Sequence, residues 1–263
     1  MKNKQKKELA VCGLAAVQSL AKENPQKVQR LYFTAEHMHL FGDLCKSMAA
    51  RKAPYNQVSN EKELQKLSGS IHHQGVVAMI DIPKIEFLSP VYVQAWVSKN
   101  ENALLLDHIG NANNFGAIIR SAAFFGIKNI IIPINEKQSS ITTSSYRVAQ
   151  GGMEFVTVLG IRSIPALLED VKNKMIRVGT DVNGTTLVEQ IASLQELKNT
   201  EEGSKKKNQP FLVALGNEEV GLSQAVKAHC DYVVKIPTPV NALDSLNVAQ
   251  AAAIILYEMS KID

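Results

Sequence analysis

The chain has 263 residues, a formal net charge of +4 at pH 7 and a hydrophobic fraction of 45%. This fraction is typical of a globular protein with a real core, and the length allows one large domain or two ordinary domains of roughly 150 residues each. The small basic excess is compatible with a polyanionic partner but does not identify one. No run of the sequence reaches the roughly 18 apolar residues of a transmembrane helix, which argues against a membrane-spanning protein.

Cysteine usage and the first residues indicate the compartment. The three cysteines lie far apart, form no Cys-x-x-Cys pair and would leave one unpaired in a disulfide scheme, which favours reduced thiols. Lysines precede an apolar stretch at residues 9–17, as in a secretory signal, but Glu8 interrupts the boundary. We therefore expect a cytoplasmic protein.

The first 82 residues predict a small α/β domain. Apolar spacing and capping residues predict helices over residues 9–20, from Thr34 to about residue 51, and after an Asn60 cap. Between and after them, apolar runs predict strands at residues 27–33, 54–58 and 75–82. Such a unit folds around a short parallel or mixed sheet, and we assign residues 1–82 to it.

The rest of the chain predicts a linker and a larger α/β domain. Residues 83–102 hold two prolines and a polar run, which favour a linker, with Trp96 packed at a domain edge. From residue 103 to 263, helices alternate with short apolar strands, expected at residues 103–106, 129–133, 155–159, 175–180, 211–215 and 232–235. This pattern is typical of a parallel sheet that is covered on both faces. The charged segment 199–210 predicts a loop or solvated insertion.

The first of three candidate functional segments follows the strand predicted at residues 103–106. Gly110 and the asparagines at 111, 113 and 114 suit a tight turn that caps a helix. Arg120 then lies among small and apolar residues of that helix. It is either a cation that faces a cleft or an exposed arginine of an amphipathic helix.

The second segment is a glycine loop, residues 216–221, between an apolar strand and a helix. Ligands of open α/β sheets bind just outside such carboxyl ends. The spacing matches neither the dinucleotide fingerprint nor the phosphate-binding loop. Glu218 and Glu219 favour a cationic or hydroxyl-bearing ligand over a phosphate. An ordinary strand-to-helix turn is the alternative.

The third segment, residues 234–248, begins with a strand that stops at Pro237, continues through a polar loop and enters an alanine-rich helix over residues 247–259. Pro237 and Pro239 stiffen the loop. Asp244 and Ser245 are natural helix caps, but capping does not account for the whole polar loop. The alanine-rich helix packs closely, which fits an interface or a threaded chain end.

Together, in this order and spacing, the three segments resemble the motifs of the SpoU/TrmH branch of the SPOUT RNA methyltransferases. The resemblance covers residues 103–259, and three motifs in order are far more specific than any one of them. The first domain, from residues 11–17 onward, also resembles the ribosomal-protein-like substrate-binding domain that many members carry.

The resemblance implies a fold, an activity and two sets of residues. The catalytic domain would carry a deep trefoil knot that binds S-adenosylmethionine, and a homodimer would methylate a ribose 2′-hydroxyl in tRNA or rRNA. By motif match, the cofactor-binding residues would be Gly216, Asn217, Gly221, Ile236 and Leu246. The catalytic residues would be Asn114, Arg120, Glu218, Ser245 and Asn247.

One departure and one chemical question accompany the resemblance. Relatives commonly have Asp-Pro before the asparagine of the first motif, whereas this chain has Asn-Ala-Asn at residues 111–113, with Asn114 and Arg120 still in register. Family proposals assign removal of the hydroxyl proton to Arg120, but a protonated guanidinium has no acceptor. Arg120 is therefore either a base or a phosphate clamp, while Ser245 and Asn247 are expected to orient the hydroxyl.

Metal binding and other functions are less favoured. No His, Cys and carboxylate set has ligand spacing, and His72 and His73 are interpreted as a surface pair, so no metal is expected. A catalytically silent RNA-binding or assembly protein is disfavoured because the motif residues are intact. A base-methylating SPOUT enzyme is disfavoured by the Ser-Leu-Asn motif at residues 245–247. A Rossmann-type dehydrogenase lacks its glycine fingerprint.

Overall fold

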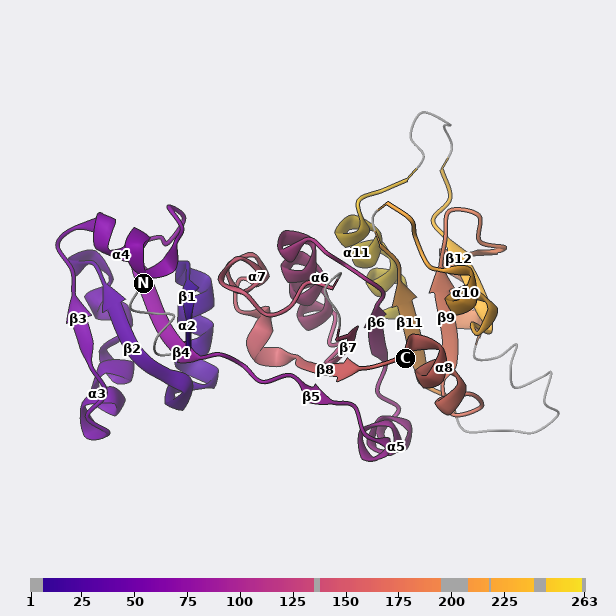
Figure 1. The fold of residues 1–263 in the computed structure, drawn as a ribbon, viewed down its shortest axis with the longest axis horizontal. Helices are drawn as coiled ribbons and strands as arrows, with labels where there is room; N and C mark the ends of the chain where they lie inside the picture. The colour runs from indigo at the N-terminus through magenta and orange to yellow at the C-terminus, as the bar shows by residue number, and fades with distance from the viewer. Residues whose placement is uncertain (1–6, 135–137, 195–207, 218, 239–244, 262–263) are drawn as a thin grey trace. The chain divides into compact units, whose positions relative to one another are not determined.

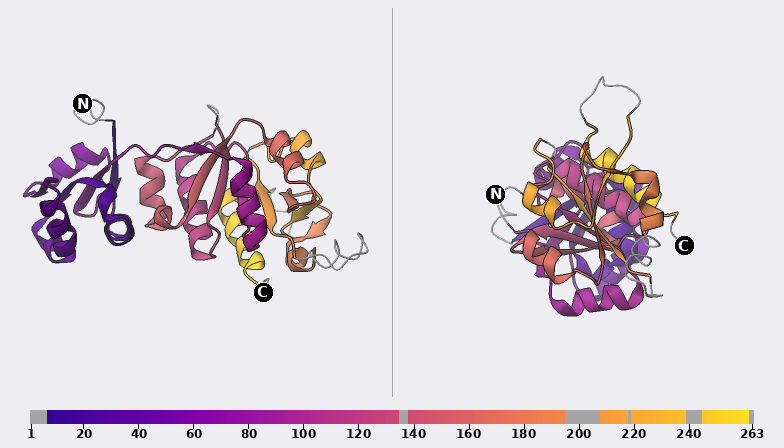
Figure 2. Two further views of the ribbon diagram at one scale, coloured as in Figure 1. Left: turned by 90° about the horizontal axis from the view of Figure 1, so that it is seen from below. Right: turned by 90° about the vertical axis from the view of Figure 1, so that its right-hand side faces the viewer.

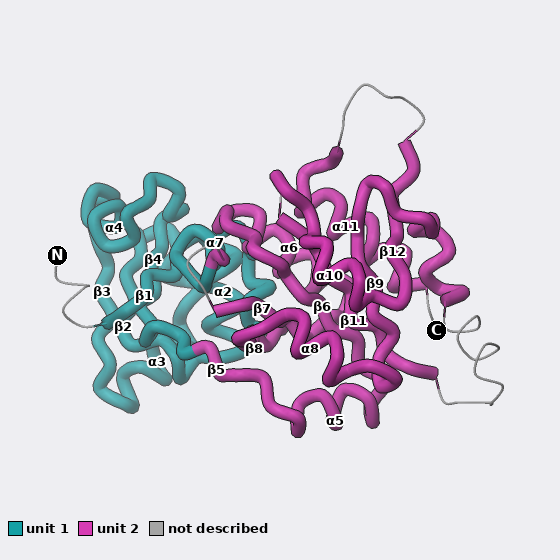
Figure 3. Tube along the Cα trace, turned by 45° about the vertical axis from the view of Figure 1, so that its right-hand side comes forward, with its two compact units in different colours: residues 1–84, 140–155 teal, residues 85–139, 156–263 magenta. Residues whose placement is uncertain are grey.

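The computed structural model describes residues 7–134, 138–194, 208–217, 219–238 and 245–261. The chain forms two compact units, which Figure 3 distinguishes by colour. Unit 1 comprises Met1–Lys84 and Ser140–Phe155, and unit 2 comprises Ile85–Ser139 and Val156–Asp263. Unit 1 thus includes a second segment, residues 140–155, from the stretch that the sequence assigned to the larger domain.

Unit 1 is built on a mixed four-stranded sheet with the order β1-β4-β2-β3 (Figure 1). Strand β4 is antiparallel to β1 and β2, and β3 is parallel to β2, as the prediction of a parallel or mixed sheet allowed. The strands are β1 (Glu8–Cys12), β2 (Val28–Phe33), β3 (Tyr55–Gln57) and β4 (Val76–Asp81). The helices are α2 (Leu14–Glu23), η1 (Pro25–Lys27), η2 (Ala35–Leu40), α3 (Gly42–Ala50), α4 (Glu61–Ser68), α7 (Thr143–Ala149) and η3 (Gly152–Phe155).

Two predicted helices of unit 1 were wrong in part. The helix expected over residues 9–20 begins at Leu14, because β1 precedes it and Gly13, at φ 94°, turns the chain between them. Side chains on both faces of β1 are buried, so its apolar run has no polar side for period-two alternation to reveal. The second helix is divided at Phe41 into the 3₁₀ helix η2 and α3.

Buried Glu154 holds the returning segment of unit 1. Its side chain is 0% exposed and accepts hydrogen bonds from Asn24 Nδ2 at 2.7 Å and from the Tyr146 hydroxyl at 2.9 Å, with Lys27 Nζ at 3.4 Å. Burial raises the pKa of the Tyr146 hydroxyl, and the negative charge of Glu154 raises it further. Because a buried carboxylate is costly without partners, these contacts join η3 to the chain around α2.

Unit 2 is built on an eight-stranded, all-parallel sheet with the order β10-β12-β9-β11-β6-β7-β8-β5. This confirms the predicted parallel sheet. The strands are β5 (Glu86–Phe87), β6 (Ala103–Leu106), β7 (Asn129–Pro133), β8 (Thr157–Ile161), β9 (Ile176–Thr180), β10 (Thr186–Leu187), β11 (Phe211–Leu215) and β12 (Tyr232–Lys235). The helices are α5 (Pro90–Lys99), α6 (Ala112–Phe124), α8 (Ile164–Asp170), η4 (Val188–Ser193), α10 (Gln224–Ala228) and α11 (Val248–Met259).

Helices cover both faces of the sheet of unit 2 (Figure 2). Side chains of α5, α8 and α10 join those of β6, β7, β8 and β11 in one apolar core. Helices α6 and α11 pack against each other, and α11 also packs against η4. The central strands β6, β7 and β11 are buried along their whole length, as expected for a parallel sheet between two helical layers.

The segment predicted as a linker contains helix α5. Ser89 precedes the helix, Pro90 occupies its first position, and Asn100 ends it in the left-handed conformation. Val93 and Trp96 are buried in the core of unit 2, so Trp96 packs against the sheet.

The charged segment 195–207 lies outside the described residues, as does most of the predicted insertion. Within the described chain, none of the helices combines the length and hydropathy needed to cross a bilayer.

A buried ion pair joins β9 to the start of β12. Arg177 donates from Nε and Nη2 to the two carboxylate oxygens of Asp231, at 3.1 and 2.9 Å, and from Nη1 to the carbonyl of Leu168 at 3.1 Å. Arg177 is buried, and its hydrogen bond to Asp231 raises its pKa above the ordinary value. The pair therefore joins β9 and β12 at their amino ends.

We predict that Asp231→Asn lowers the free energy of unfolding by about 3–5 kcal/mol, because it removes the hydrogen-bonded counter-charge of buried Arg177. Urea denaturation measures the change. Asp43→Asn is the matched control, since Asp43 and Lys46 form an exposed pair worth about 0–1 kcal/mol. Equal unfolding midpoints for the two variants would contradict the prediction.

Candidate functional site

A cavity of about 660 Å³ lies at the carboxyl ends of β12, β9 and β11, three neighbouring strands of the unit 2 sheet. Each strand continues directly into a loop that lines the cavity, and the first turns of α11 close it. This is the edge at which open α/β sheets bind ligands. The predicted site residues that line it are Gly216, Asn217, Gly221, Ile236, Ser245 and Leu246. The second and third motif loops therefore meet in one cavity.

Close backbone contact shapes the second motif loop. Asn217 and Gly221 form a β-bridge, and the Gly221 amide donates to the Asn217 carbonyl at 3.0 Å. A Cβ on Gly216 would lie 2.4 Å from the carbonyl carbon of Gly221 and 2.4 Å from the amide nitrogen of Leu222. Only glycine fits at residue 216, because any side chain would push this turn apart.

The Asn217 side chain connects the second motif loop to the first. Its Oδ1 accepts from the amides of Glu219 and Val220, at 2.9 and 3.2 Å, which holds the turn closed. Its Nδ2 donates to the carbonyl of His108 at 2.8 Å. Asn217 was predicted to bind the cofactor, and in the structure its side-chain amide holds two loops together beside the cavity.

The loop that leads into α6 has further polar supports that no motif in the sequence indicates. Buried Gln138 accepts from the Ile109 amide at 2.9 Å and donates back to the Ile109 carbonyl at 3.1 Å. Buried Asp107 pairs with His108, which has a positive φ of 59°. No pattern in the neighbouring sequence marks Gln138 as a support of this loop, so only its tertiary contact with Ile109 reveals that role.

One hydrogen bond joins the first motif to the third. Asn247 Nδ2 donates to Asn114 Oδ1 at 3.1 Å, while Asn247 Oδ1 caps α11 by accepting from the Ala249 amide at 2.9 Å. Asn111, in the departure from the family pattern, caps α6 by accepting from the amides of Asn113 and Asn114. The two predicted catalytic asparagines thus meet where α6 and α11 begin.

Arg120 lies outside this cavity. It is exposed on α6 and is not among the lining residues. At about 100° per residue, its position on the helix is about 20° from Asn113 but about 120° from Asn114. Arg120 therefore faces away from Asn114, and neither Asn114 nor Asn247 is itself among the residues that line the cavity. The predicted catalytic residue Glu218 and the predicted cap Asp244 lie outside the described residues.

Two further cavity residues were not singled out from the sequence. Asp181 follows β9, Lys227 lies on α10, and Lys227 Nζ is 2.8 Å from Asp181 Oδ2. Burial opposes ionisation of Asp181, but the hydrogen bonds from Lys227 and from the Asn183 amide outweigh it and lower the pKa of the Asp181 carboxyl. An acidic residue directly after a predicted strand was the signal that could have found Asp181.

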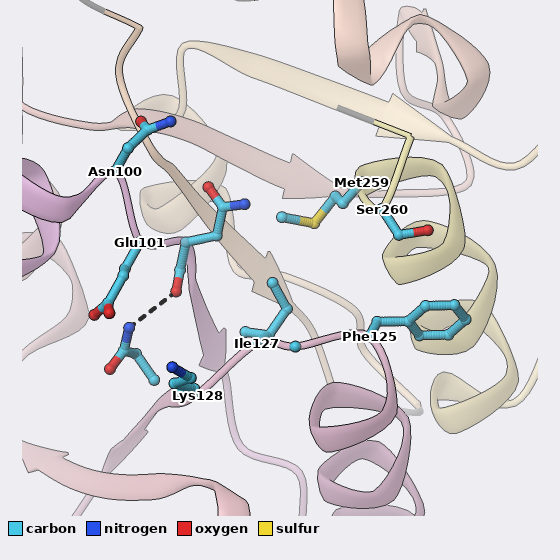
Figure 4. A pocket seen from close by; sticks show the side chains of 10 residues that line it. Asn100, Glu101, Phe125, Ile127, Lys128, Met259 and Ser260 are labelled. Carbon is cyan, nitrogen blue, oxygen red and sulfur yellow. Dashed lines mark hydrogen bonds between the residues drawn. The ribbon is translucent and has the colours of Figure 1, made fainter. Parts of the chain in front are cut away.

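A second cavity, of about 300 Å³, lies at the other end of the same sheet (Figure 4). Its walls include Glu101 and Lys128, which precede β6 and β7, and Ser260, which follows α11. None of the predicted site residues that the structure describes lines it. Its position at the amino ends of the strands, away from the motif loops, makes it the weaker candidate.

A metal site has no support in the described ranges. They contain no group of three or more His, Cys, Asp or Glu side chains placed to hold a metal ion. Of the adjacent histidines, His72 is exposed, whereas His73 is buried and accepts from the Gly75 amide through Nδ1 at 3.2 Å. The prediction of a surface pair was therefore wrong for His73, which supports a turn.

Comparison with protein families matches both parts of the chain. The model of the SpoU rRNA Methylase family matches residues 101–257, and that of RNA 2'-O ribose methyltransferase substrate binding matches residues 10–85. The chain belongs to the SpoU rRNA Methylase family. The first match contains all three motif loops and the cavity, and the second covers residues 10–84 of unit 1 and the first residue of unit 2.

Individual relatives agree with this membership. An uncharacterized tRNA/rRNA methyltransferase of Haemophilus influenzae is 31% identical over 71% of this chain, and the chain spans 53% of that relative's length. The 23S rRNA (guanosine-2'-O-)-methyltransferase RlmB of Acinetobacter baylyi is 30% identical, with 94% of each chain covered. The SpoU methyltransferase AviRb of Streptomyces viridochromogenes, whose crystal structure contains the cofactor AdoMet, has the same fold. The TM-score is 0.74 at 24% identity, and the match covers 99% of this chain and 92% of that chain.

We predict that Gly216→Ala destabilises the protein by about 1–3 kcal/mol, because the added methyl group collides with the backbone at Gly221. Thermal unfolding measures the loss. Gly42→Ala is the control, since a Cβ at Gly42 meets no atom within 4 Å and its φ is not positive. A Gly216→Ala midpoint equal to that of the control would show that the turn at residues 216–221 is not tight.

Proposed function

We propose that this protein is an S-adenosylmethionine-dependent RNA methyltransferase that methylates a ribose 2′-hydroxyl in tRNA or rRNA. The observation that carries the proposal is the convergence of the second and third motif loops on one cavity in a chain of the SpoU family. The match of residues 10–85 to a substrate-binding model supports RNA as the partner. The RlmB relatives are named for methylation of guanosine at the 2′-oxygen, which favours the ribose over a base.

The cavity fits S-adenosylmethionine in size and chemistry. Its volume of about 660 Å³ falls within the range of roughly 300–1,000 Å³ that is usual for small-molecule sites. Ile236, Leu246 and Val248 offer apolar walls for an adenine ring. The tight turn at Gly216 has no side chain at this residue, which leaves its backbone open to a ligand. When bound, S-adenosylmethionine supplies a methyl group that its positively charged sulfur makes electrophilic.

The residues at the start of α11 would position the ribose. We infer that Ser245 and Asn247 orient the hydroxyl and that Asn114 fixes Asn247 through their 3.1 Å hydrogen bond. Alignment of a nucleophile with the group that it attacks lowers a barrier by up to roughly 7–11 kcal/mol. Glu218 completes the proposed catalytic set by motif match alone.

Arg120 would act on the RNA rather than on the cofactor. Its exposed position on α6, outside the cavity, favours a phosphate clamp over a base, because a guanidinium binds phosphate through paired N–H groups. Proton removal by Arg120 is the alternative that the family resemblance offers.

We also propose a homodimer with the trefoil knot of the family, acting in the cytoplasm. An exposed aromatic group supports the dimer: Phe124 on α6 is 82% exposed and Tyr257 on α11 is 53% exposed, with Phe125 in contact with both rings. Large exposed apolar groups of this kind mark interaction surfaces. The aromatic group lies at the carboxyl ends of α6 and α11, and Asn114 and Asn247 lie at the amino ends of the same two helices, so a second copy docked here would cover helices that begin at the proposed site.

The proposed activity predicts transfer of labelled methyl groups from S-adenosylmethionine to unmodified tRNA or rRNA, and ribose-methylated dinucleotides that resist alkaline and nuclease cleavage. We expect Arg120→Ala to lower turnover by at least about 100-fold while cofactor affinity stays within about two-fold. Arg162→Ala is the control and should keep full turnover. Arg162 is exposed and lies over the ring of Phe87, next to β5 and β8 at the opposite end of the strand order from the cavity.

Each alternative function gives a different result in that assay. A methylated base in the digest would indicate a base-methylating enzyme. Cofactor-independent RNA binding without transfer would indicate the catalytically silent protein. Turnover of Arg120→Ala equal to that of the unchanged protein would remove the role of Arg120 and leave the activity itself intact.

The dimer proposal predicts that sedimentation gives twice the chain mass of 28.8 kDa. Phe124→Lys should shift the protein towards the monomer, because it places a charge in an apolar interface. Val91→Lys changes another exposed apolar residue, on α5, and should leave the mass unchanged. A monomer in the unchanged protein would refute the dimer.

A further inference from the structure

An acid–base pair lies in the wall of the cavity, outside the motif loops. Asp181 is the first residue after β9 and Lys227 belongs to α10, and both line the cavity. The Asp181 carboxylate is 13% exposed and the Lys227 side chain 30% exposed, with 2.8 Å between Oδ2 and Nζ. The pair is therefore largely withdrawn from water but open to a ligand in the cavity.

The backbone holds Asp181 rigidly. Its amide donates to the Val234 carbonyl at 3.0 Å, its carbonyl accepts from the Gly184 amide at 3.0 Å, and its Oδ1 accepts from the Asn183 amide at 2.8 Å. A Cβ on Gly184 would lie 2.7 Å from the carbonyl carbon of Val234, so this turn is packed directly on β12. The carboxylate is thus oriented before any ligand binds, which lowers the entropic cost of recognition.

The charge of the pair selects the kind of group that it can bind. Lys227 neutralises Asp181, so the pair attracts a cationic sulfonium or amine weakly. The other charged residues of the cavity wall, Glu219 and Lys235, also have opposite signs. A carboxylate keeps further lone pairs after two hydrogen bonds, and an ammonium group has three donors. Two neighbouring hydroxyls can add to such a pair without separating it, because each hydroxyl both donates and accepts.

We propose that Asp181 and Lys227 bind the 2′- and 3′-hydroxyls of the ribose in an adenosyl cofactor. In this arrangement the Asp181 carboxylate accepts from the hydroxyls, and Lys227 orients the carboxylate and donates to a hydroxyl oxygen. The inference rests on the proposed function, since it assigns part of the same cavity to one part of the cofactor. A zwitterionic amino-acid group is the competing ligand, but it would have to break the 2.8 Å pair to match its two separate charges.

Binding calorimetry with 5′-methylthioadenosine and its 2′,3′-dideoxy analogue tests the proposal, because these ligands have no amino-acid group. For the unchanged protein, we expect loss of both hydroxyls to weaken binding by at least about ten-fold, as for hydrogen bonds to charged groups. In the Asp181→Asn variant, the side-chain oxygen accepts the hydrogen bond from the Asn183 backbone amide, and the side-chain NH2 group replaces Oδ2. No acceptor then faces the ligand, and the same loss should cost less than about three-fold.

Two variants serve as controls. Glu169→Gln makes the matched acid-to-amide change on the surface and should keep the full ten-fold difference. Lys227→Gln removes the orienting charge and should also reduce the difference, which tests the pair even if Asp181→Asn does not fold. Thermal unfolding of each variant separates a change in recognition from a loss of structure.

The outcomes distinguish this inference from the function on which it rests. A folded Asp181→Asn variant that keeps the ten-fold difference in affinity overturns the inference. The inference is also overturned if the variant binds S-adenosylhomocysteine more weakly but 5′-methylthioadenosine equally well, since that result assigns the pair to the amino-acid group. If the unchanged protein binds neither compound, the proposed cofactor itself is wrong and the inference falls with it.

Discussion

The backbone hydrogen bonds that hold β12, β9 and β11 in parallel register are the constraint on which the site depends. Parallel strands end at the same edge of a sheet, so three chain segments that are far apart in sequence must enter their loops side by side. The Arg177–Asp231 pair reinforces this register at the far end of two of the strands. The cavity is the consequence, because loops that leave neighbouring strands in one direction enclose a space that no single loop could form.

Within that frame, side-chain amides rather than charges set the positions of the loops. Asn217 joins the second motif to the first, Gln138 supports the entry to α6, and Asn247 joins the third motif to the first through Asn114. An amide donates and accepts at once, so it can connect two backbone segments without the desolvation cost of a buried charge. Positions fixed in this way are suited to a reaction in which alignment of the reacting groups is the main requirement.

The sequence predicted the parallel sheet and the motif loops well because both depend on local signals. Buried parallel strands are continuous apolar runs, and a loop at a strand end shows as glycine, proline or asparagine beside such a run. Local signals failed where burial was set by distant segments. Residues 9–12 were predicted as helix because both faces of β1 are covered, and α5 was missed because Val93 and Trp96 gain their partners only from the core of unit 2.

The sequence by itself determined the family, the alternation of elements and the residues of the three motifs, since each is written in spacing along the chain. Only the tertiary structure decided which of those residues meet. It brought Asn114 to Asn247, left Arg120 on the surface of α6, and added Asp181 and Lys227 to the wall of the cavity. The reason is that contacts between segments far apart in the chain depend on strand order and loop path, which no local pattern of residues encodes.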